Sequence, residues 1–264
     1  EIMTGTFKPG IIFESSGTTG MKPSRHFVKD PALYQESFTR AFHLFYGEPK
    51  DWCIIGLLPS YLERQQSSLV LMVDELVRLS RHSQSGFYLY DHEKLQQNLM
   101  ELESEKQPVL LIGVTYALLD FAEKYPMKLR YTVVMETGGM KGRREEMTRA
   151  EVHEILKMQW GLSHVHSEYG MTELLSQAYS KGAGIFYPAD TMKVLIREED
   201  DPFVIHENGN RQYEGIINVI DLANVWSCAF IATEDAGVLY PDGSFEVKGR
   251  VDYSDIRGCS LMVV

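Results

Sequence analysis

A run of glycine and hydroxyl residues near the start of the chain has the composition of a phosphate-binding loop. It reads Ser15-Ser16-Gly17-Thr18-Thr19-Gly20. The two glycines permit a close backbone approach and positive φ angles, and successive backbone N–H groups in such a loop form a nest that binds anions. The hydroxyls supply further hydrogen-bond donors. The run therefore predicts a loop that binds a polyanion such as a phosphate chain.

The spacing of this run excludes a Walker A loop. That motif requires the pattern G-x-x-x-x-G-K-[ST], whereas only two residues separate Gly17 from Gly20, and Lys22 is followed by Pro23. A structural alternative stays open, because short Ser/Thr/Gly runs are also typical of ordinary loops and flexible linkers. Other parts of the chain must therefore decide what kind of loop this is.

Polar clusters also follow two apolar runs that have the character of strands. Residues 136–142 (ETGGMKG) follow the run that ends at Met135, and residues 166–173 (HSEYGMTE) follow the run that ends at Val165. The second cluster combines an aromatic ring, a hydroxyl and a carboxylate. A Mg²⁺ ion held by one carboxylate and by phosphate oxygens is typical of nucleotide sites. Later in the chain, Asp235 and Arg250 are candidates to hold ribose hydroxyls.

The first two thirds of the chain alternate between helices and strands. Asp30-Pro31 has the pattern of an N-cap followed by proline at the first helical position, and residues 148–151 (TRAE) form a capping box. The expected helices are 31–46, 67–81, 92–105, 115–125 and 149–160, and the expected strands are 52–58, 86–90, 109–113, 131–135 and 163–167. This alternation predicts an α/β fold with a doubly wound, mainly parallel sheet, in which ligands bind beyond the carboxyl ends of the strands.

From about Ile185 the pattern changes to strands alone. We expect strands at 192–196 and 215–220, and a hairpin over 238–247 that turns at Asp242-Gly243, because an Asp-Gly pair between apolar runs favours a tight turn. The sequence therefore predicts two domains. An α/β core that binds ATP or AMP spans residues 1–184, and a smaller β-rich subdomain with a cysteine-containing tail spans residues 185–264.

The composition excludes several classes of protein. Of the 264 residues, 44% are hydrophobic, yet no apolar run approaches the roughly 18 residues that span a membrane. The formal net charge of −11 disfavours binding to nucleic acid or to anionic membranes. The three cysteines, Cys53, Cys228 and Cys259, are too few and too scattered for a disulfide or zinc framework. We therefore expect a reduced, cytoplasmic protein.

Four motifs in order make the chain resemble a known superfamily. SSGTTG, YGMTE, TEDAG and GRVD occur in the order typical of the adenylate-forming enzymes, which include acyl- and aryl-CoA ligases, luciferases and peptide-synthetase adenylation domains. Within it the chain is most similar to the LuxE-type acyl-protein synthetases, on the residues MKPS after the loop, the cluster GGMKGR and the ending RGCSLM. The resemblance covers nearly the whole chain.

The resemblance implies ATP- and Mg²⁺-dependent activation of a carboxylic acid, with a fatty acid as the expected substrate. The acid would become acyl-AMP with release of pyrophosphate, and a thiol on this chain or on a partner protein would then take the acyl group. It also implies a role for each matching residue. For the phosphates, residues 15–20 with Lys22 would hold the β- and γ-phosphates, Thr172 would contact the α-phosphate and Glu173 would hold Mg²⁺.

For the nucleoside, Tyr169 would stack on adenine, and Asp235 and Arg250 would bind ribose. Gly138, Gly139 and Gly170 would line the nucleotide and acyl sites, and Cys259 would accept the acyl group.

The chain also departs from the superfamily pattern. Most members carry a mobile C-terminal domain with a catalytic lysine after the last motif, whereas residues 251–264 follow Arg250 here. We therefore expect the core without that domain, with the lysine absent or replaced by Lys22, Lys141, Arg143, Arg144 or Arg257. Two other readings stay open. One is a CoA ligase of the phenylacetate type, and the other is a nucleotide-binding protein that has lost catalysis.

Overall fold

The computed structural model describes residues 3–15, 23–59, 66–140, 144–145 and 147–250. Among the predicted site residues, Ser16 to Gly20, Lys22 and Cys259 lie outside this set. Within it, one twelve-stranded sheet and one separate two-stranded sheet organise the chain. No helix in the described part of the chain has the length and apolar composition to span a lipid bilayer.

Five parallel strands form one half of the large sheet, in the order β4-β3-β5-β6-β7. They are β3 (Cys53–Leu57), β4 (Gly86–Phe87), β5 (Val109–Val114), β6 (Thr132–Thr137) and β7 (His166–Tyr169). β3 and β5 are buried at every position, as expected for parallel strands that helices cover on both faces.

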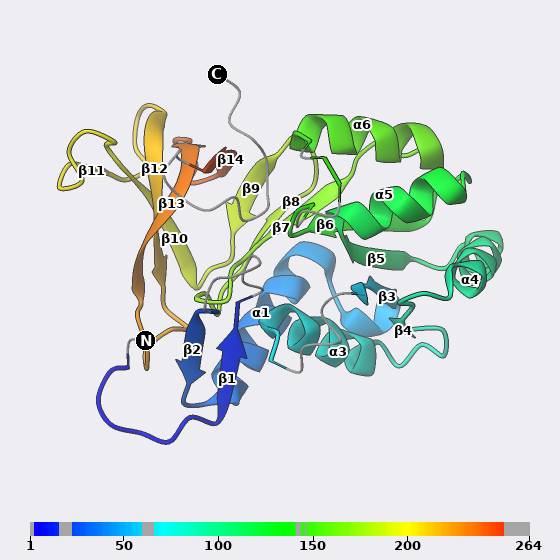
Figure 1. Ribbon diagram of the computed structural model, residues 1–264, viewed down its shortest axis with the longest axis horizontal. Coiled ribbons are helices and arrows are strands. Elements are labelled where there is room, and N and C mark those ends of the chain that lie inside the picture. Colours follow the sequence, from blue (N-terminus) through cyan, green and yellow to red (C-terminus); the bar gives the residue numbers. More distant parts are fainter. Residues whose placement is uncertain (1–2, 16–22, 60–65, 141–143, 146, 251–264) are drawn as a thin grey trace.

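Helices cover both faces of this parallel half. They are α1 (Pro31–Tyr46), α3 (Ser68–Ser80), α4 (His92–Glu105), α5 (Thr115–Lys124) and α6 (Arg149–Trp160), with a short 3₁₀ helix η1 (Pro49–Asp51) before β3. Figure 1 shows α1 and α3 on one face and α5 and α6 on the other. The Asp30 carboxylate caps α1, and Thr148 and Glu151 form the capping box of α6. The doubly wound α/β prediction is therefore confirmed.

Antiparallel strands form the other half of the sheet. β8 (Ala178–Ser180) and β9 (Ile185–Pro188) extend the sheet from β7, and β14 (Phe245–Arg250), β13 (Phe230–Leu239), β12 (Tyr213–Asp221), β10 (Met192–Arg197) and β11 (Ile205–His206) follow in that order. The predicted hairpin joins β13 to β14. Asp242 accepts hydrogen bonds from the Ser244 amide and hydroxyl, and Gly243 has a φ of 85°, which explains the Asp-Gly pair at this turn.

A small hairpin stands apart from the large sheet, near the start of the chain. Its strands are β1 (Ile11–Glu14) and β2 (Arg25–Val28), which pair antiparallel. These strands were not predicted, because each is only four residues long. Their register pairs Glu14, at the end of β1, with Arg25, at the start of β2 (Figure 1).

Three predicted strand boundaries were wrong. β7 begins at His166, not at residue 163, and β6 continues through Glu136 and Thr137, so that the first residues of both polar clusters belong to strands. The register explains this, since Met135 pairs with His166 and Glu136 with Ser167. Polar side chains are tolerated there because they bond to one another, as described below. β4 has two residues and not five.

Two hydrophobic clusters make up the core. The larger lies between the parallel strands and the helices, and includes Phe38, Leu111 and Trp160. The smaller lies against the antiparallel strands, around Phe186 and Phe245, and it also includes Tyr169 and Leu174. The predicted domain boundary at residues 184/185 stays a prediction, and the sheet itself continues across it through β8, β9 and β14.

Candidate active site

The β1–β2 hairpin brings Ser15 and Ser24 together beside Glu173. The Ser15 amide donates to the Ser24 carbonyl at 3.0 Å, and the Ser24 amide donates to the Ser15 hydroxyl at 2.8 Å. The Ser24 hydroxyl in turn donates to Glu173 Oε1 at 2.6 Å. Ser15, the first residue of the predicted phosphate loop, and Glu173, the predicted metal-binding carboxylate, therefore both contact Ser24.

The segment after β7, residues 170–177, is held in place by hydrogen bonds to its backbone. His26 on β2 donates from Nδ1 to the Thr172 carbonyl at 2.7 Å, and the Asn224 side-chain amide donates to the Glu173 carbonyl at 2.6 Å. Because these anchors use backbone carbonyls, they leave the half-buried side chains of Thr172 and Glu173 available for a ligand.

Asp221, at the end of β12, is the deepest anchor of this segment. Its side chain is fully buried. Oδ2 accepts hydrogen bonds from the Leu175 and Ser176 amides at 2.7 and 3.1 Å. Oδ1 accepts from the Ser176 hydroxyl at 2.6 Å and from the Ala223 amide at 3.0 Å. Four donors compensate the burial of one carboxylate, which fixes the segment against the antiparallel half of the sheet.

Tyr169, Asp235 and Arg250 come together from three strands. The Tyr169 hydroxyl donates to Asp235 Oδ2 at 2.8 Å, and Arg250 Nε donates to Asp235 Oδ1 at 3.1 Å. Asp235 and Arg250 are direct register partners across β13 and β14. The Tyr169 ring is only 8% exposed and lies edge-on to Phe186 and Phe245. Tyr169 is thus a member of the smaller hydrophobic cluster as well as a partner of Asp235.

The two predicted glycines follow β6 directly. Gly138 adopts a φ of 71°, a left-handed conformation that L side chains rarely adopt, and Gly139 is buried. The Thr115 hydroxyl, at the start of α5, lies 3.4 Å from the Gly138 carbonyl and 3.3 Å from Glu136 Oε2. The turn is therefore held to the end of the neighbouring strand.

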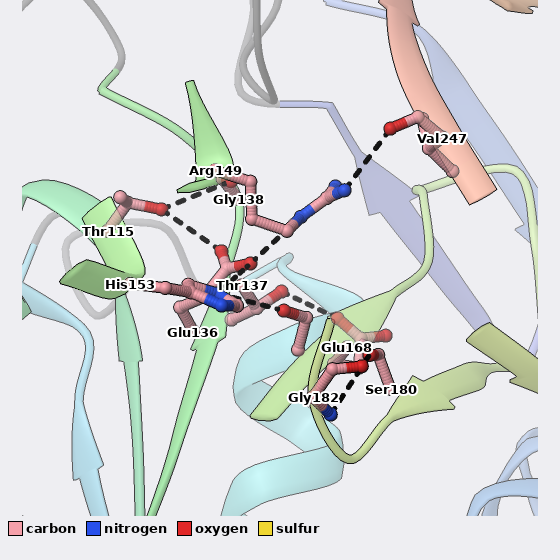
Figure 2. A network of polar contacts seen from close by, with 11 residues as sticks. Thr115, Glu136, Thr137, Gly138, Arg149, His153, Glu168, Ser180, Gly182 and Val247 are labelled. Atoms are coloured by element: carbon pink, nitrogen blue, oxygen red, sulfur yellow. Dashed lines mark hydrogen bonds and ion pairs between the residues drawn. The ribbon is translucent and has the colours of Figure 1, made fainter. Parts of the chain in front are cut away.

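A buried polar network under this turn escaped the sequence analysis. The Glu136 carboxylate lies 3.3 Å from Arg149 Nε and 3.6 Å from His153 Nε2, and Arg149 also donates to the Val247 carbonyl on β14 (Figure 2). Burial raises the pKa of Glu136, but the hydrogen bond from His153 and the charge of Arg149 outweigh it, so this pKa lies below its ordinary value. Arg149 and His153 are four residues apart on α6, which places them on one helix face and was the available signal.

Glu168 is the second carboxylate that was missed, and its surroundings differ. The Thr137 hydroxyl donates to Glu168 Oε2 at 2.6 Å (Figure 2), and no ion pair involves Glu168 within the described residues. Burial, together with the charge of Glu136, raises the pKa of Glu168 to about 7, while the Thr137 hydrogen bond acts in the opposite direction. The carboxyl therefore titrates near neutral pH.

The donor set suits a magnesium ion that is held largely by phosphate. No group of three or more His, Cys, Asp or Glu side chains is arranged to hold a metal ion within the described residues. Glu173 offers a half-buried carboxylate with Ser24 as its neighbour. One hard oxygen ligand is enough for Mg²⁺ where phosphate and water supply its other ligands, so Glu173 fits the predicted role.

No family model matches the sequence, and no curated protein matches it. Solved structures do match. ATP-bound MatB from Rhodopseudomonas palustris is 18% identical with a TM-score of 0.63, over 90% of this chain and 47% of that one. The luciferase-like enzyme of the mealworm Zophobas morio is 17% identical with a TM-score of 0.59, over 96% and 60%. O-succinylbenzoate CoA synthetase from Bacillus subtilis, with ATP and magnesium, is 16% identical with a TM-score of 0.57, over 93% and 52%.

The chain has the fold of the adenylate-forming enzymes. At these identities the likeness shows the fold alone. The chain spans about half the length of the structures it matches. The roles of the individual residues remain predictions.

Proposed function

We propose that this chain activates a carboxylic acid with ATP and Mg²⁺. A carboxylate oxygen of the substrate attacks the α-phosphorus of ATP, the bond to the bridging oxygen breaks, and acyl-AMP and pyrophosphate form. The observation that carries the proposal is the hydrogen bond from Ser24 to Glu173, because Ser24 also bonds to Ser15, the first residue of the glycine-rich run. The fold supports it, since matched structures contain ATP, or ATP and magnesium, in their own sites.

The residues divide this task by position. Residues 15–20 and Lys22 would hold the β- and γ-phosphates, and Glu173 would hold Mg²⁺, which neutralises phosphate charge when bound. Thr172, one residue earlier, would donate to the α-phosphate. Adenosine would lie against Tyr169, Asp235 and Arg250, with Tyr169 at adenine and the other two residues at ribose. Gly138, Gly139 and Gly170 would bring the backbone close to the nucleotide.

The Asp235–Arg250 pair is suited to binding hydroxyl groups. Asp235 accepts from Tyr169 and Arg250 and is 7% exposed, so its position is fixed before a ligand arrives. A carboxylate that is already oriented loses little conformational entropy on binding. Arg250 is part-exposed and brings a positive charge to the same place. These contacts favour a ligand-binding role over a purely structural one for both residues.

For the second step, we propose that a thiol takes the acyl group from acyl-AMP. The thiolate sulfur attacks the acyl carbonyl, and AMP leaves with its oxygen. Cys259 is our candidate acceptor, on the resemblance to acyl-protein synthetases and on its neighbours Arg257 and Gly258. An arginine lowers the pKa of a nearby thiol. Incubation with ATP, Mg²⁺ and labelled octanoate should label the wild type but not Cys259→Ser, and equal labelling of both would rule this role out.

Transfer to CoA is the second candidate. Matched structures include a malonyl-CoA ligase with methylmalonyl-CoA and AMP bound, which favours it over other thiols of low molecular mass. Release of AMP that depends on added CoA would support this reading, and ATP-dependent acylation of the protein itself would support the first.

Exchange of labelled pyrophosphate into ATP tests the first step directly. We expect exchange that requires both Mg²⁺ and a carboxylic acid, measured across fatty, aryl and amino acids. ATP binding without exchange for any acid would instead indicate a nucleotide-binding protein that has lost catalysis, and would contradict the proposed function.

A further inference from the structure

Arg149, the first residue of α6, contacts three strands of the large sheet. Its Nε lies 3.3 Å from Glu136 Oε1 on β6, and its Nη1 donates to the Val247 carbonyl on β14 at 3.2 Å (Figure 2). Its guanidinium also lies over the ring of Phe186 on β9, 5.0 Å from the ring centre. The side chain is only 14% exposed. Arg149 thus joins the parallel half of the sheet to the antiparallel half.

Helix formation does not explain an arginine at this position. A positive charge in the first turn of a helix opposes the helix dipole, and Thr148 and Glu151 already cap α6. Pairing with Glu136 would require one charged nitrogen, whereas the planar guanidinium presents several donors in a fixed geometry and also reaches Val247. The contact with β14 is therefore the feature that arginine adds here.

The pairing of β9 with β14 ends where Arg149 lies. Within the described residues this pairing comprises two residue pairs, and the last joins Glu246 to Ile185, the first residue of β9. The next carbonyl along β14, that of Val247, accepts its hydrogen bond from Arg149. A Cβ atom at Gly184, just before β9, would lie 3.7 Å from Arg149 Nη1, so the guanidinium lies beside the start of β9. Arg149 therefore continues the connection between the two halves beyond the end of this ladder.

The two strands that Arg149 connects lead to two parts of the proposed nucleotide site. On β14, Arg250 follows three residues after Val247 and is the register partner of Asp235 on β13. On β6, Glu136 lies two residues before Gly138, where the glycine turn begins. The guanidinium thus ties the strand of the proposed ribose contacts to the strand that ends at the glycine turn.

We propose that Arg149 is a positioning residue that holds β14, and with it Arg250 and Asp235, in place relative to the Gly138 turn for recognition of the ribose. The inference rests on the proposed function, because it assumes that ATP binds between these elements. Arg149 acts through β14 and does not contact the nucleotide itself. Without its hydrogen bond β14 is free to shift, and a displacement of about 1 Å in an aligned site costs up to about 100-fold in rate.

Pyrophosphate exchange with ATP, 2′-deoxy-ATP and 3′-deoxy-ATP tests the inference. The ratio of kcat/KM between ATP and each deoxy analogue reports recognition of one ribose hydroxyl, and it does not depend on the fraction of enzyme that is folded. For the wild type we expect a ratio of at least about 10 for one analogue, as for a hydrogen bond to a charged group. Arg149→Met retains an unbranched apolar side chain without donors, and it should lower this ratio at least about 5-fold. It should also raise KM for ATP more than KM for the acid.

A second variant keeps the test decisive if Arg149→Met is unstable. That substitution leaves the Glu136 carboxylate buried without its arginine, and an uncompensated buried charge is strongly destabilising. The double variant Glu136→Gln/Arg149→Met removes the charge as well, and it should fold and show the same lowered ratio. The melting temperature of each variant reports whether it folds.

Arg40→Met is the matched control. It removes an exposed guanidinium on α1 that pairs with Asp190, and it should keep the wild-type ratio. If the folded Arg149→Met and double variants keep the wild-type ratio, the inference is wrong while the proposed function stands. If the wild type uses the deoxy analogues as well as ATP, the inference and the ribose contacts are wrong, although activation of the acid still stands. If no acid supports exchange with ATP, the proposed function fails, and the inference fails with it.

Discussion

Glu136 and Glu168 are carboxylates on neighbouring strands with opposite electrostatic surroundings. Arg149 and His153 keep the pKa of Glu136 below its ordinary value, whereas burial raises the pKa of Glu168 to about 7. Neither residue was assigned a role from the sequence. For Glu168 the reason is physical: its partner Thr137 lies on the neighbouring parallel strand about 30 positions away, and no local pattern encodes that register. For Glu136 the partners lie on α6, and their spacing alone did not show which strand the helix face would cover.

Glu168 should make the stability of the protein depend on pH. Its pKa is about 7 in the folded state against an ordinary value of 4.5. At a pH below 4.5 the carboxyl is protonated in both the folded and the unfolded state, and it does not lower the free energy of unfolding. As pH rises toward 7 the unfolded state ionises first, so the free energy of unfolding falls. Between about pH 4.5 and pH 7.5, we expect the free energy of unfolding of Glu168→Gln to rise by about 1–3 kcal/mol relative to that of the wild type.

Urea unfolding of both proteins at the two ends of this pH range measures that gain. Comparing the variant with the wild type removes the contribution of Glu136, which has the opposite sign. If the difference in unfolding free energy between Glu168→Gln and the wild type stayed constant with pH, the pKa of Glu168 would not be raised in the folded protein.

At the scale of elements, the helices were predicted well because their signals are local. The Asp30 cap, the Thr148 capping box and the apolar faces all lie within one helix turn of the residues they control, so no distant contact is needed to recognise them. β8 and β9 were missed because they have three and four residues and form by pairing with each other and with the distant strands β7 and β14. β7 was placed three residues early, since its polar side chains are buried by partners on other strands.

The Asp221 carboxylate is the most heavily hydrogen-bonded anchor of the segment that carries Thr172 and Glu173, and this gives a prediction at the same scale. Asp221→Ala removes the acceptor of four hydrogen bonds and leaves buried donors at Leu175 and Ser176 without a partner. We expect the free energy of unfolding to fall by about 3 kcal/mol or more, with loss of pyrophosphate exchange at temperatures where the variant is still folded. Chemical denaturation and exchange assays measure the two effects.

A suitable control lies on the surface. Asp190→Ala removes an exposed ion pair with Arg40, and such pairs contribute roughly 0–1 kcal/mol. If Asp221→Ala were no more destabilising than Asp190→Ala, the anchoring role of Asp221 would be wrong.

For the whole molecule, the fold followed from the order of its elements. Alternating helices and strands predicted the parallel sheet, because this pattern allows few arrangements. The shift to strands alone predicted a β-rich subdomain, and in the structure these strands continue the same sheet as its antiparallel half. The sequence motifs predicted which side chains would gather, and the structure brings Tyr169 to Asp235 and Arg250, and Ser24 to Glu173. The sequence did not predict the polar network around Glu136 and Glu168, because its members come from different strands and from α6.

The central claim is that the glycine-rich run and Glu173 form one Mg²⁺–ATP site, and the Glu173→Gln variant tests it most directly. Glutamine retains an oxygen that accepts the hydrogen bond from Ser24 but is neutral and binds Mg²⁺ poorly. In pyrophosphate exchange at saturating acid, we expect a loss of about 100-fold or more, comparable to that caused by removing one group that stabilises a transition state, with a nearly unchanged melting temperature. Exchange close to the wild-type rate in a folded Glu173→Gln protein would contradict the account.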